Sequence, residues 1–309
     1  MRALALSSAL LLGGCVAVAS EPPSPYDIAI TIDDLTWVGP THPKGEVAAN
    51  HAMIHTLVAH GVPATVFVNC DRVDPSLGIL EAWRDAGMEL ANHQAAHDDL
   101  NKTPPPAWLE GVRRCDTLLR GLTGAPIAHF RYPYLYNGPS PAVRDQVLAE
   151  LTGTLGYAIG RVSVDNHEWK IADYYGQAVV AGDQPRAEAL ADYYLEHMLA
   201  GVDNYQAVAQ RKLGRDIDHV LLLHANSLNT DQLDRLLTAL EADGARFVSL
   251  GQALKDPVYA LPQAYEGKWG YSWLYRIAPL DDDRAWDDAS WQEIEARFGE
   301  GAPGATAHP

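Results

Sequence analysis

Two carboxylates and two histidines follow apolar, strand-like runs of the chain, and together these residue types can hold a metal ion. Asp33 and Asp34 come directly after the run 28–32, and His93 and His97 follow another such run. Two imidazoles and one carboxylate form a metal site that keeps open positions for water and substrate. The second carboxylate can then accept a proton from water, whose pKa a zinc ion lowers to about 7.

The spacing of the two histidines is informative only together with their position. Histidines four residues apart lie on one face of a helical turn, so the spacing predicts that His93 and His97 reach one ion from such a turn. His51 and His55 have the same spacing but lie inside a predicted helix at 46–60. Because that helix is far from any strand end, we interpret this second pair as a solvated or partly buried helical face.

The pair of aspartates has two interpretations. Adjacent side chains of an extended strand point to opposite sides, but at a frayed strand end both can turn toward one pocket. The alternative is a helix cap or a turn. Five apolar β-type residues precede Asp33 and Asp34, which favours the strand end.

Strand-like and helix-like segments alternate along the chain, which predicts parallel strands joined by helical crossovers. Seven or eight such units fit a closed (β/α) barrel of the α/β class better than an open sheet. We expect strands at 28–32, 64–68, 88–91, 127–130, 157–164, 219–223 and 245–248, and helices at 46–60, 77–86, 106–121, 140–153, 186–212 and 229–243.

Unusual polar residues stand at the predicted strand ends, where barrels of this kind carry their chemistry. Besides the aspartates and His93, they include Arg131, Asp165 and His224. A histidine at the end of an apolar strand is more often a core or capping residue. The other residues of this set favour a catalytic role for His224.

Five motifs in this order resemble those of the polysaccharide deacetylases, also called the NodB homology family or carbohydrate esterase family four. They cover residues 27–250 and are Thr31-Ile32-Asp33-Asp34, His93-x-x-x-His97, Arg131-Tyr132-Pro133-Tyr134, Asp165-x-x-Glu168-Trp169 and Leu221-Leu222-Leu223-His224. The resemblance implies a distorted (β/α) barrel and metal-dependent removal of acetyl groups from N-acetylated sugars.

The resemblance also implies a role for each matching residue. Asp34, His93 and His97 would bind a divalent metal, for which zinc is suited and cobalt, nickel or iron also fit. Among the catalytic residues, Asp33 would be the general base, Arg131 would orient Asp33, Asp165 would fix Arg131, and His224 would be the general acid. Among the residues that contact the substrate, the backbone N–H of Tyr134 would donate to the oxyanion. Trp169 would form a wall of the groove, and Leu222 would line the acetyl-methyl pocket.

The first and third motifs depart from the family pattern. Ile32 and Leu35 stand where the family usually has phenylalanine and glycine, and Tyr132 and Leu135 replace a proline and a glycine. Glu168 replaces the usual aspartate. No chemical group is lost, so these changes affect the expected substrate more than the expected activity and indicate a divergent subgroup.

Composition narrows the range of partners and the location. With 40 acidic and 23 basic residues the formal charge is −17, so the chain repels nucleic acid. Residues 1–20 contain a short apolar run that resembles an export signal. Either Cys15 is lipidated after Leu12-Gly13-Gly14, giving an anchored lipoprotein, or cleavage follows Ala17-Val18-Ala19. Both alternatives place the protein in the periplasm or outside the cell.

The remaining cysteines and the C-terminal segment leave alternatives open. Cys70 and Cys115 can form a disulfide in an oxidising compartment or remain separate buried thiols. We divide the chain into a leader (1–20), a catalytic domain (21–255) and an aromatic-rich extension (256–309). The extension holds four of the eight tryptophans, Trp269, Trp273, Trp286 and Trp291, and either packs on the barrel or forms a glycan-binding flap.

Three functions are compatible with this sequence. The first is N-deacetylation of an envelope or extracellular polysaccharide. The second is hydrolysis of a non-sugar C–N bond at the same metal site, because the substrate-facing loops are altered. The third is glycan binding without catalysis, against which the intact base and acid positions argue.

Overall fold

The computed structural model describes residues 25–278 and 284–299 and contains one curved sheet of seven strands, all paired in parallel. Neighbouring strands follow the order β5-β4-β3-β2-β1-β6, and β7 pairs with the first residues of β1. The strands are β1 (Tyr26–Leu35), β2 (Thr65–Val68), β3 (Glu89–Asn92), β4 (His129–Phe130), β5 (Ala158–Ile159), β6 (His219–His224) and β7 (Ala245–Phe247). The predicted α/β class and strand number are confirmed.

One irregular segment, 158–164, joins the two edges of the sheet. Its first part is β5, which pairs with β4. Further along, Val164 bridges to Leu221 of β6, and the Ser163 N–H donates to the Val220 carbonyl. The sheet therefore curls into a distorted barrel, whose strands end on the same side.

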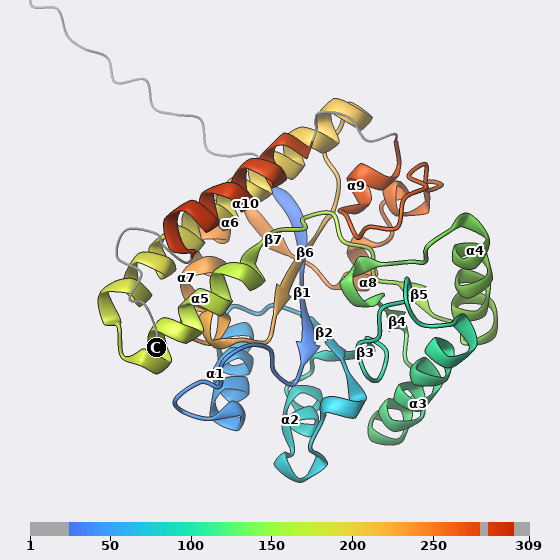
Figure 1. The fold of residues 1–309 in the computed structure, drawn as a ribbon, viewed down its shortest axis with the longest axis horizontal. Helices are drawn as coiled ribbons and strands as arrows, with labels where there is room; N and C mark the ends of the chain where they lie inside the picture. The colour runs from blue at the N-terminus through green and yellow to red at the C-terminus, as the bar shows by residue number, and fades with distance from the viewer. Residues whose placement is uncertain (1–24, 279–283, 300–309) are drawn as a thin grey trace, which may run out of the picture.

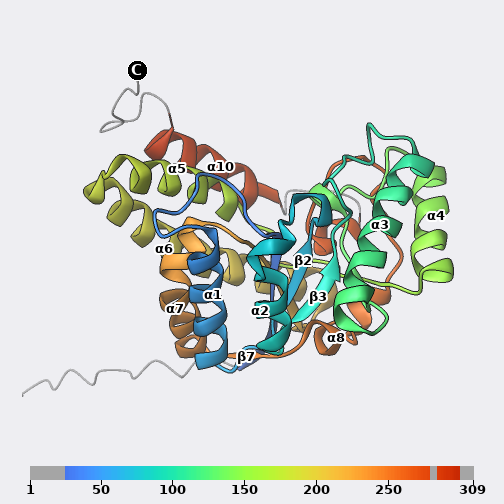
Figure 2. The same ribbon diagram turned by 90° about the horizontal axis from the view of Figure 1, so that it is seen from below.

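Helices surround the sheet on its outside (Figure 1). Turned by 90°, the molecule shows α7, α1, α2 and α3 in succession around it (Figure 2), and α1 packs on both α7 and α2. The helices are α1 (Glu46–Ala59), α2 (Ile79–Asp85), α3 (Pro105–Thr123), α4 (Pro141–Ala149), α5 (Glu168–Ala181), α6 (Gln184–Leu213), α7 (Ser227–Ala242), α8 (Leu250–Ala253), α9 (Trp273–Arg276) and α10 (Ala285–Phe298).

The central strands β1 and β6 form from nearly continuous apolar sequence. Almost every residue of β1 and β6 is buried, as expected of parallel strands covered on both faces. The predicted helix at 186–212 is α6, which begins after the Asp183 cap and ends at Gly214 with φ of 68°. The additional helix α5 precedes it and was not predicted. Its first residue, Glu168, is buried and lies 2.9 Å from His224 at the end of β6.

Cys70 and Cys115 are joined in a disulfide that links the segment after β2 to α3. This settles the alternative that the sequence left open. The predicted leader and Cys15 lie outside the described residues. Within the described ranges, no helix has both the length and the apolar character that a membrane crossing requires.

Candidate active site

Asp34, His93 and His97 converge, although they come from two different strand ends. Each offers one ligand atom, and these atoms all lie within 4.8 Å of one another. Asp34 Oδ1 is 3.1 Å from His97 Nε2 and 3.5 Å from His93 Nε2. This oxygen is buried and accepts no hydrogen bond. A buried acceptor facing two imidazole nitrogens is a donor set that a divalent cation would satisfy.

The two imidazoles are held in the form that binds a metal. His93 Nδ1 lies 2.9 Å from the carbonyl oxygen of Arg131, so this nitrogen carries the proton and Nε2 offers its lone pair. Burial, followed by the charge of His93, lowers the pKa of His97 to about 3. His97 is therefore neutral at physiological pH, as a metal ligand must be.

The predicted helical turn between His93 and His97 is wrong, because residues 93–98 form an irregular loop after β3. Gln94 and His97 both have φ of 60°. The Asn69 amide donates to the carbonyls of His93 and Gln94, and the Gln94 side-chain oxygen accepts the N–H of Asp98. These hydrogen bonds, and not helical geometry, bring the two imidazoles to one point.

Left-handed backbone conformations concentrate at this site. Such conformations are uncommon outside glycine, and they persist where the surrounding structure enforces them. The non-glycine residues with positive φ among those described are Asp34, Gln94, His97, Tyr134 and Leu135. His51 and His55, by contrast, are exposed on α1, and no metal-ligand cluster among the described residues includes them.

Asp33 forms a buried ion pair with Arg131. The distance from Arg131 Nη1 to Asp33 Oδ1 is 2.6 Å, and the two residues are 1% and 3% exposed. Arg131 also donates to Thr31 Oγ1 and to the carbonyl of Gly160. Arg131 therefore holds one oxygen of the Asp33 carboxylate, and its role in orienting a catalytic base stays a prediction.

Asp165 does not take the position that the resemblance implied. Within residues 25–278 and 284–299 it makes no hydrogen bond or ion pair with Arg131, which Thr31 and Gly160 hold instead. Asp165 lines the same pocket as Asp33. Burial, followed by the charge of Asp287, raises the pKa of Asp165 to about 7.

His224 is paired with Glu168, a residue that the sequence analysis did not assign to the site. His224 Nδ1 and Glu168 Oε2 are 2.9 Å apart. The other carboxylate oxygen accepts the amides of Asn226 and Asn229. Burial alone would lower the pKa of His224, but the hydrogen bond and charge of Glu168, with the charges of the two aspartates, raise it to about 9. The place of Glu168 beside Trp169 in the fourth motif was the signal that could have identified it.

These groups face one cavity of about 400 Å³. Tyr134, Trp169 and Leu222 line it together with the aspartates and four histidines, His93, His97, His167 and His224. Trp169 and Tyr134 remain 43% and 51% exposed, while Leu222 is buried. Two residues from beyond position 256, Gly270 and Trp291, complete the wall.

The segment after position 256 packs on the barrel and also borders the site. Trp273 is buried, and its backbone N–H donates to the Val162 carbonyl. A Cβ added to Gly270 would lie 1.8 Å from the Tyr134 carbonyl oxygen. Arg276 donates to the carbonyl of Leu135. The extension thus holds the loop that carries Tyr134, while the 255/256 boundary stays a prediction.

Comparisons with known proteins give a family match and several solved structures with a similar fold. Residues 20–153 match the family model described as polysaccharide deacetylase. The fold resembles a wild-type carbohydrate esterase family four pseudoenzyme from Bacillus anthracis, with 17% identity and a TM-score of 0.53 over 75% of this chain and 66% of that one.

Two further solved structures share the fold. A mutant of the same pseudoenzyme, described as having restored enzymatic activity, has 19% identity and a TM-score of 0.54 over 75% of this chain and 69% of that one. Peptidoglycan deacetylase PdaC from Bacillus subtilis has 20% identity and a TM-score of 0.51 over 75% and 91% of the two chains. The family match thus covers residues 20–153, and the solved structures show that the chain shares the fold of carbohydrate esterase family four proteins.

Proposed function

We propose that the protein is a metal-dependent hydrolase that removes N-acetyl groups from an envelope or extracellular polysaccharide. The observation that carries this proposal is the meeting of three groups in one cavity: the ligand set of Asp34, His93 and His97, the ion-paired Asp33, and the carboxylate-paired His224. Amide hydrolysis requires an activated water, a stabilised oxyanion and a proton for the departing amine. Each requirement has a candidate group here.

Asp33 is placed to accept the proton of the attacking water. Arg131 fixes one oxygen of its carboxylate at 2.6 Å, and Oδ2 faces His93 Nε2 at 3.6 Å. A base held in this way needs no rearrangement when it takes up a proton. A divalent cation held by Asp34 and the two histidines would polarise the acetyl carbonyl and lower the pKa of water.

His224 is placed to donate a proton to the amine. Glu168 raises the pKa of His224 to about 9. The imidazole is therefore protonated at neutral pH and carries the proton that the leaving nitrogen needs. We assign the stabilisation of the oxyanion to the backbone N–H of Tyr134, and the contact with the acetyl methyl group to Leu222.

The walls of the cavity support a glycan as substrate. Tyr134, Tyr136, Trp169 and Trp291 present aromatic side chains around it, and such rings offer flat apolar faces beside polar groups. The Cys70–Cys115 disulfide is typical of oxidising compartments, which supports export to the periplasm or beyond. The same proposal includes a lipid anchor to the membrane through Cys15, and it includes no nucleic-acid partner.

The proposal is tested by acetate release from N-acetylglucosamine oligomers and from peptidoglycan. We expect release that a chelator abolishes and that added zinc restores. The Asp33→Asn variant is the matched control, because it removes the base and leaves the metal ligands in place. Metal-loaded protein that releases no acetate from any acetylated glycan would contradict the proposal.

Two alternatives follow from specific observations. The replaced residues Leu35, Tyr132 and Leu135 motivate a second hypothesis, a non-sugar amide as substrate, and a screen of small amides with the same enzyme would reveal it. Pseudoenzymes are among the structures that share the fold, which raises the alternative of glycan binding without catalysis. In that case glycan affinity would persist and neither Asp33→Asn nor chelation would change any measured rate.

A further inference from the structure

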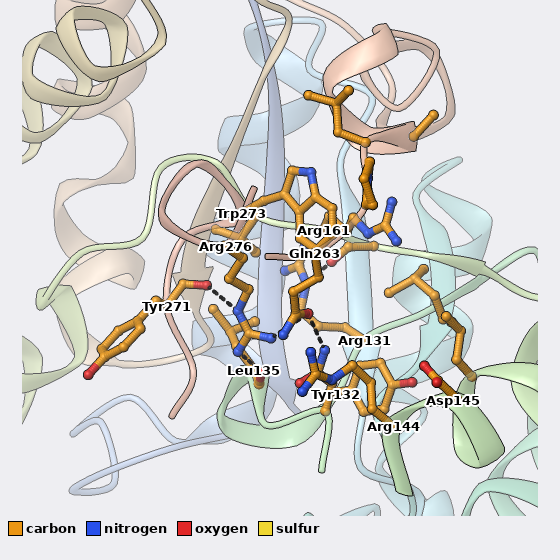
Figure 3. A pocket seen from close by; sticks show the side chains of 18 residues that line it. Arg131, Tyr132, Leu135, Arg144, Asp145, Arg161, Gln263, Tyr271, Trp273 and Arg276 are labelled. Atoms are coloured by element: carbon orange, nitrogen blue, oxygen red, sulfur yellow. Dashed lines mark hydrogen bonds between the residues drawn. The ribbon is translucent and has the colours of Figure 1, made fainter. Parts of the chain in front are cut away.

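A second cavity, of about 390 Å³, lies beside the active-site pocket and shares Leu135 with its wall. Figure 3 shows the side chains around it, which come from the segments after β4 and β5, from α4 and from the extension. Its most unusual feature is charge, because four arginines line it: Arg131, Arg144, Arg161 and Arg276.

Three of these arginines lack a counter-charge. Arg131 pairs with Asp33, but in the described part of the chain Arg144, Arg161 and Arg276 form no ion pair with any carboxylate. This is unexpected in a protein with 40 acidic and 23 basic residues. Asp145 is the acidic residue in the lining, and it is exposed.

Two of the three arginines are buried, and the third, Arg161, is half-buried. Arg144 and Arg276 are 8% and 4% exposed. Burial lowers the pKa of Arg161, and burial followed by the charge of Arg144 lowers the pKa of Arg276 to about 10. All three remain cationic at neutral pH, so this part of the described chain holds a concentration of positive charge without an ion pair. The charge of Asp165 acts on Arg276 at longer range.

Neutral contacts hold these side chains in place. Arg276 donates to the carbonyls of Leu135, Trp269 and Tyr271. Arg144 donates to the Tyr265 carbonyl through Nη1, and the Arg161 guanidinium stacks 3.8 Å from the ring centroid of Trp273. Carbonyl oxygens and aromatic rings satisfy or cover some of the donors, but they do not neutralise a positive charge.

Several buried donors at this cavity have no acceptor among the residues that the structure describes. They are Arg131 Nη2, Arg144 Nε and Nη2, and the hydroxyl of Tyr132. Buried polar groups in proteins are almost always paired, and each exception requires an explanation. A negatively charged ligand would supply both the missing acceptors and the missing counter-charge, because guanidinium groups bind carboxylate and phosphate in a planar, two-pronged geometry.

We propose that this cavity is a binding site for a small organic anion that carries a carboxylate or phosphate group. Arg144, Arg161 and Arg276 bind the charged group. Leu148, Ile159 and other apolar residues of the wall contact its uncharged body. The site is separate from the metal pocket and does not depend on the function proposed above.

The proposal is tested by calorimetric titration of the full chain with three probes: glucuronate, glucose 6-phosphate and glucose. We expect saturable binding of at least one anion and none of glucose, and comparison of the two anions identifies the preferred charged group. Arg161→Gln is the diagnostic variant, because its side chain makes no hydrogen bond within the described ranges. It should weaken anion binding at least tenfold.

Two controls make the outcome decisive. Arg235→Gln removes an exposed arginine of α7 that pairs with Asp192, and His97→Ala removes a metal ligand; both should bind the anion as the wild type does. Melting temperatures report folding. Arg161→Lys keeps the charge but loses the two-pronged geometry and the stacking on Trp273, so it should weaken anion binding to an intermediate degree, and it replaces Arg161→Gln if that variant unfolds. Absence of anion binding, equal loss in Arg235→Gln, or loss in His97→Ala alone would overturn the proposal.

Discussion

Replacement of Glu168 by glutamine tests the acid side of the proposed reaction. The Glu168 carboxylate lies 2.9 Å from His224 Nδ1, and its side chain is 1% exposed. At a charge separation of about 4 Å and an effective dielectric constant of about 20, such a pair is worth about 4 kcal/mol. Since 1.36 kcal/mol corresponds to one pKa unit, removing the charge should lower the pKa of His224 by about three.

The sign of the effect on rate follows from the role of His224. As a general acid it must be protonated, so activity falls as pH rises through its pKa. That pKa is about 9 in the wild type and should be about 6 in Glu168→Gln. At pH 7.5 about 3% of the variant's imidazole would be protonated, which predicts a rate about 30-fold lower. At acid pH the two enzymes should converge.

The assay is the pH profile of kcat/KM for acetate release between pH 5 and pH 10. Glu168→Asp is the matched control, because it restores the negative charge and should keep the alkaline limb near that of the wild type. Melting temperatures of both variants show whether the contacts to Asn226 and Asn229 survive. An alkaline limb in Glu168→Gln that stays at the wild-type pH, in a folded and active enzyme, would refute the reasoning.

The remaining predictions concern the base, the extension and the disulfide. Asp33→Asn should lower kcat by a factor of about 10²–10⁴ with unchanged metal content, and a rate near that of the wild type would contradict its role. Gly270→Ala places a Cβ 1.8 Å from the Tyr134 carbonyl, so it should displace that loop and reduce kcat/KM, while unchanged kinetics would show that the extension does not support the site. Cys115→Ala removes a disulfide that joins positions 45 residues apart, so it should reduce the free energy of unfolding by about 4 kcal/mol. Urea titration measures this free energy, and a variant as stable as the wild type under oxidising conditions would refute the prediction.

Much of the site could be predicted because parallel strands bring their carboxyl ends to one side of the sheet. Asp33, His93, Arg131 and His224 each follow or end a short apolar run, so local pattern alone indicated that they meet. The strand order was not needed for that conclusion. The same reasoning separated His93 from His51, which lies within a helix.

The parts that were not predicted depend on long-range contacts or on backbone detail. Glu168 reaches His224 only because α5 begins beside β6, at a sequence distance of 56 residues. The loop from His93 to His97 takes left-handed conformations at Gln94 and His97, which histidine spacing does not reveal. Asp165 carried a role by analogy, and the contact on which that role depended is not formed.

The second cavity, with its arginines, also could not be predicted from local sequence patterns. Arg144 and Arg276 belong to segments more than 130 positions apart, and no local pattern relates them. Only the packing of α9 against the loop after β4 brings their charges together. Residues that meet at strand ends are therefore more accessible to sequence reasoning than residues that meet across a packed extension.

The most direct test of the central claim is elemental analysis of the purified protein beside its Asp34→Asn and His97→Ala variants. The account predicts about one divalent ion per wild-type chain, a large loss of metal in both variants, and retained metal in Asp33→Asn. A wild-type protein that stays free of metal when zinc is supplied, or variants that keep their full metal content, would contradict it.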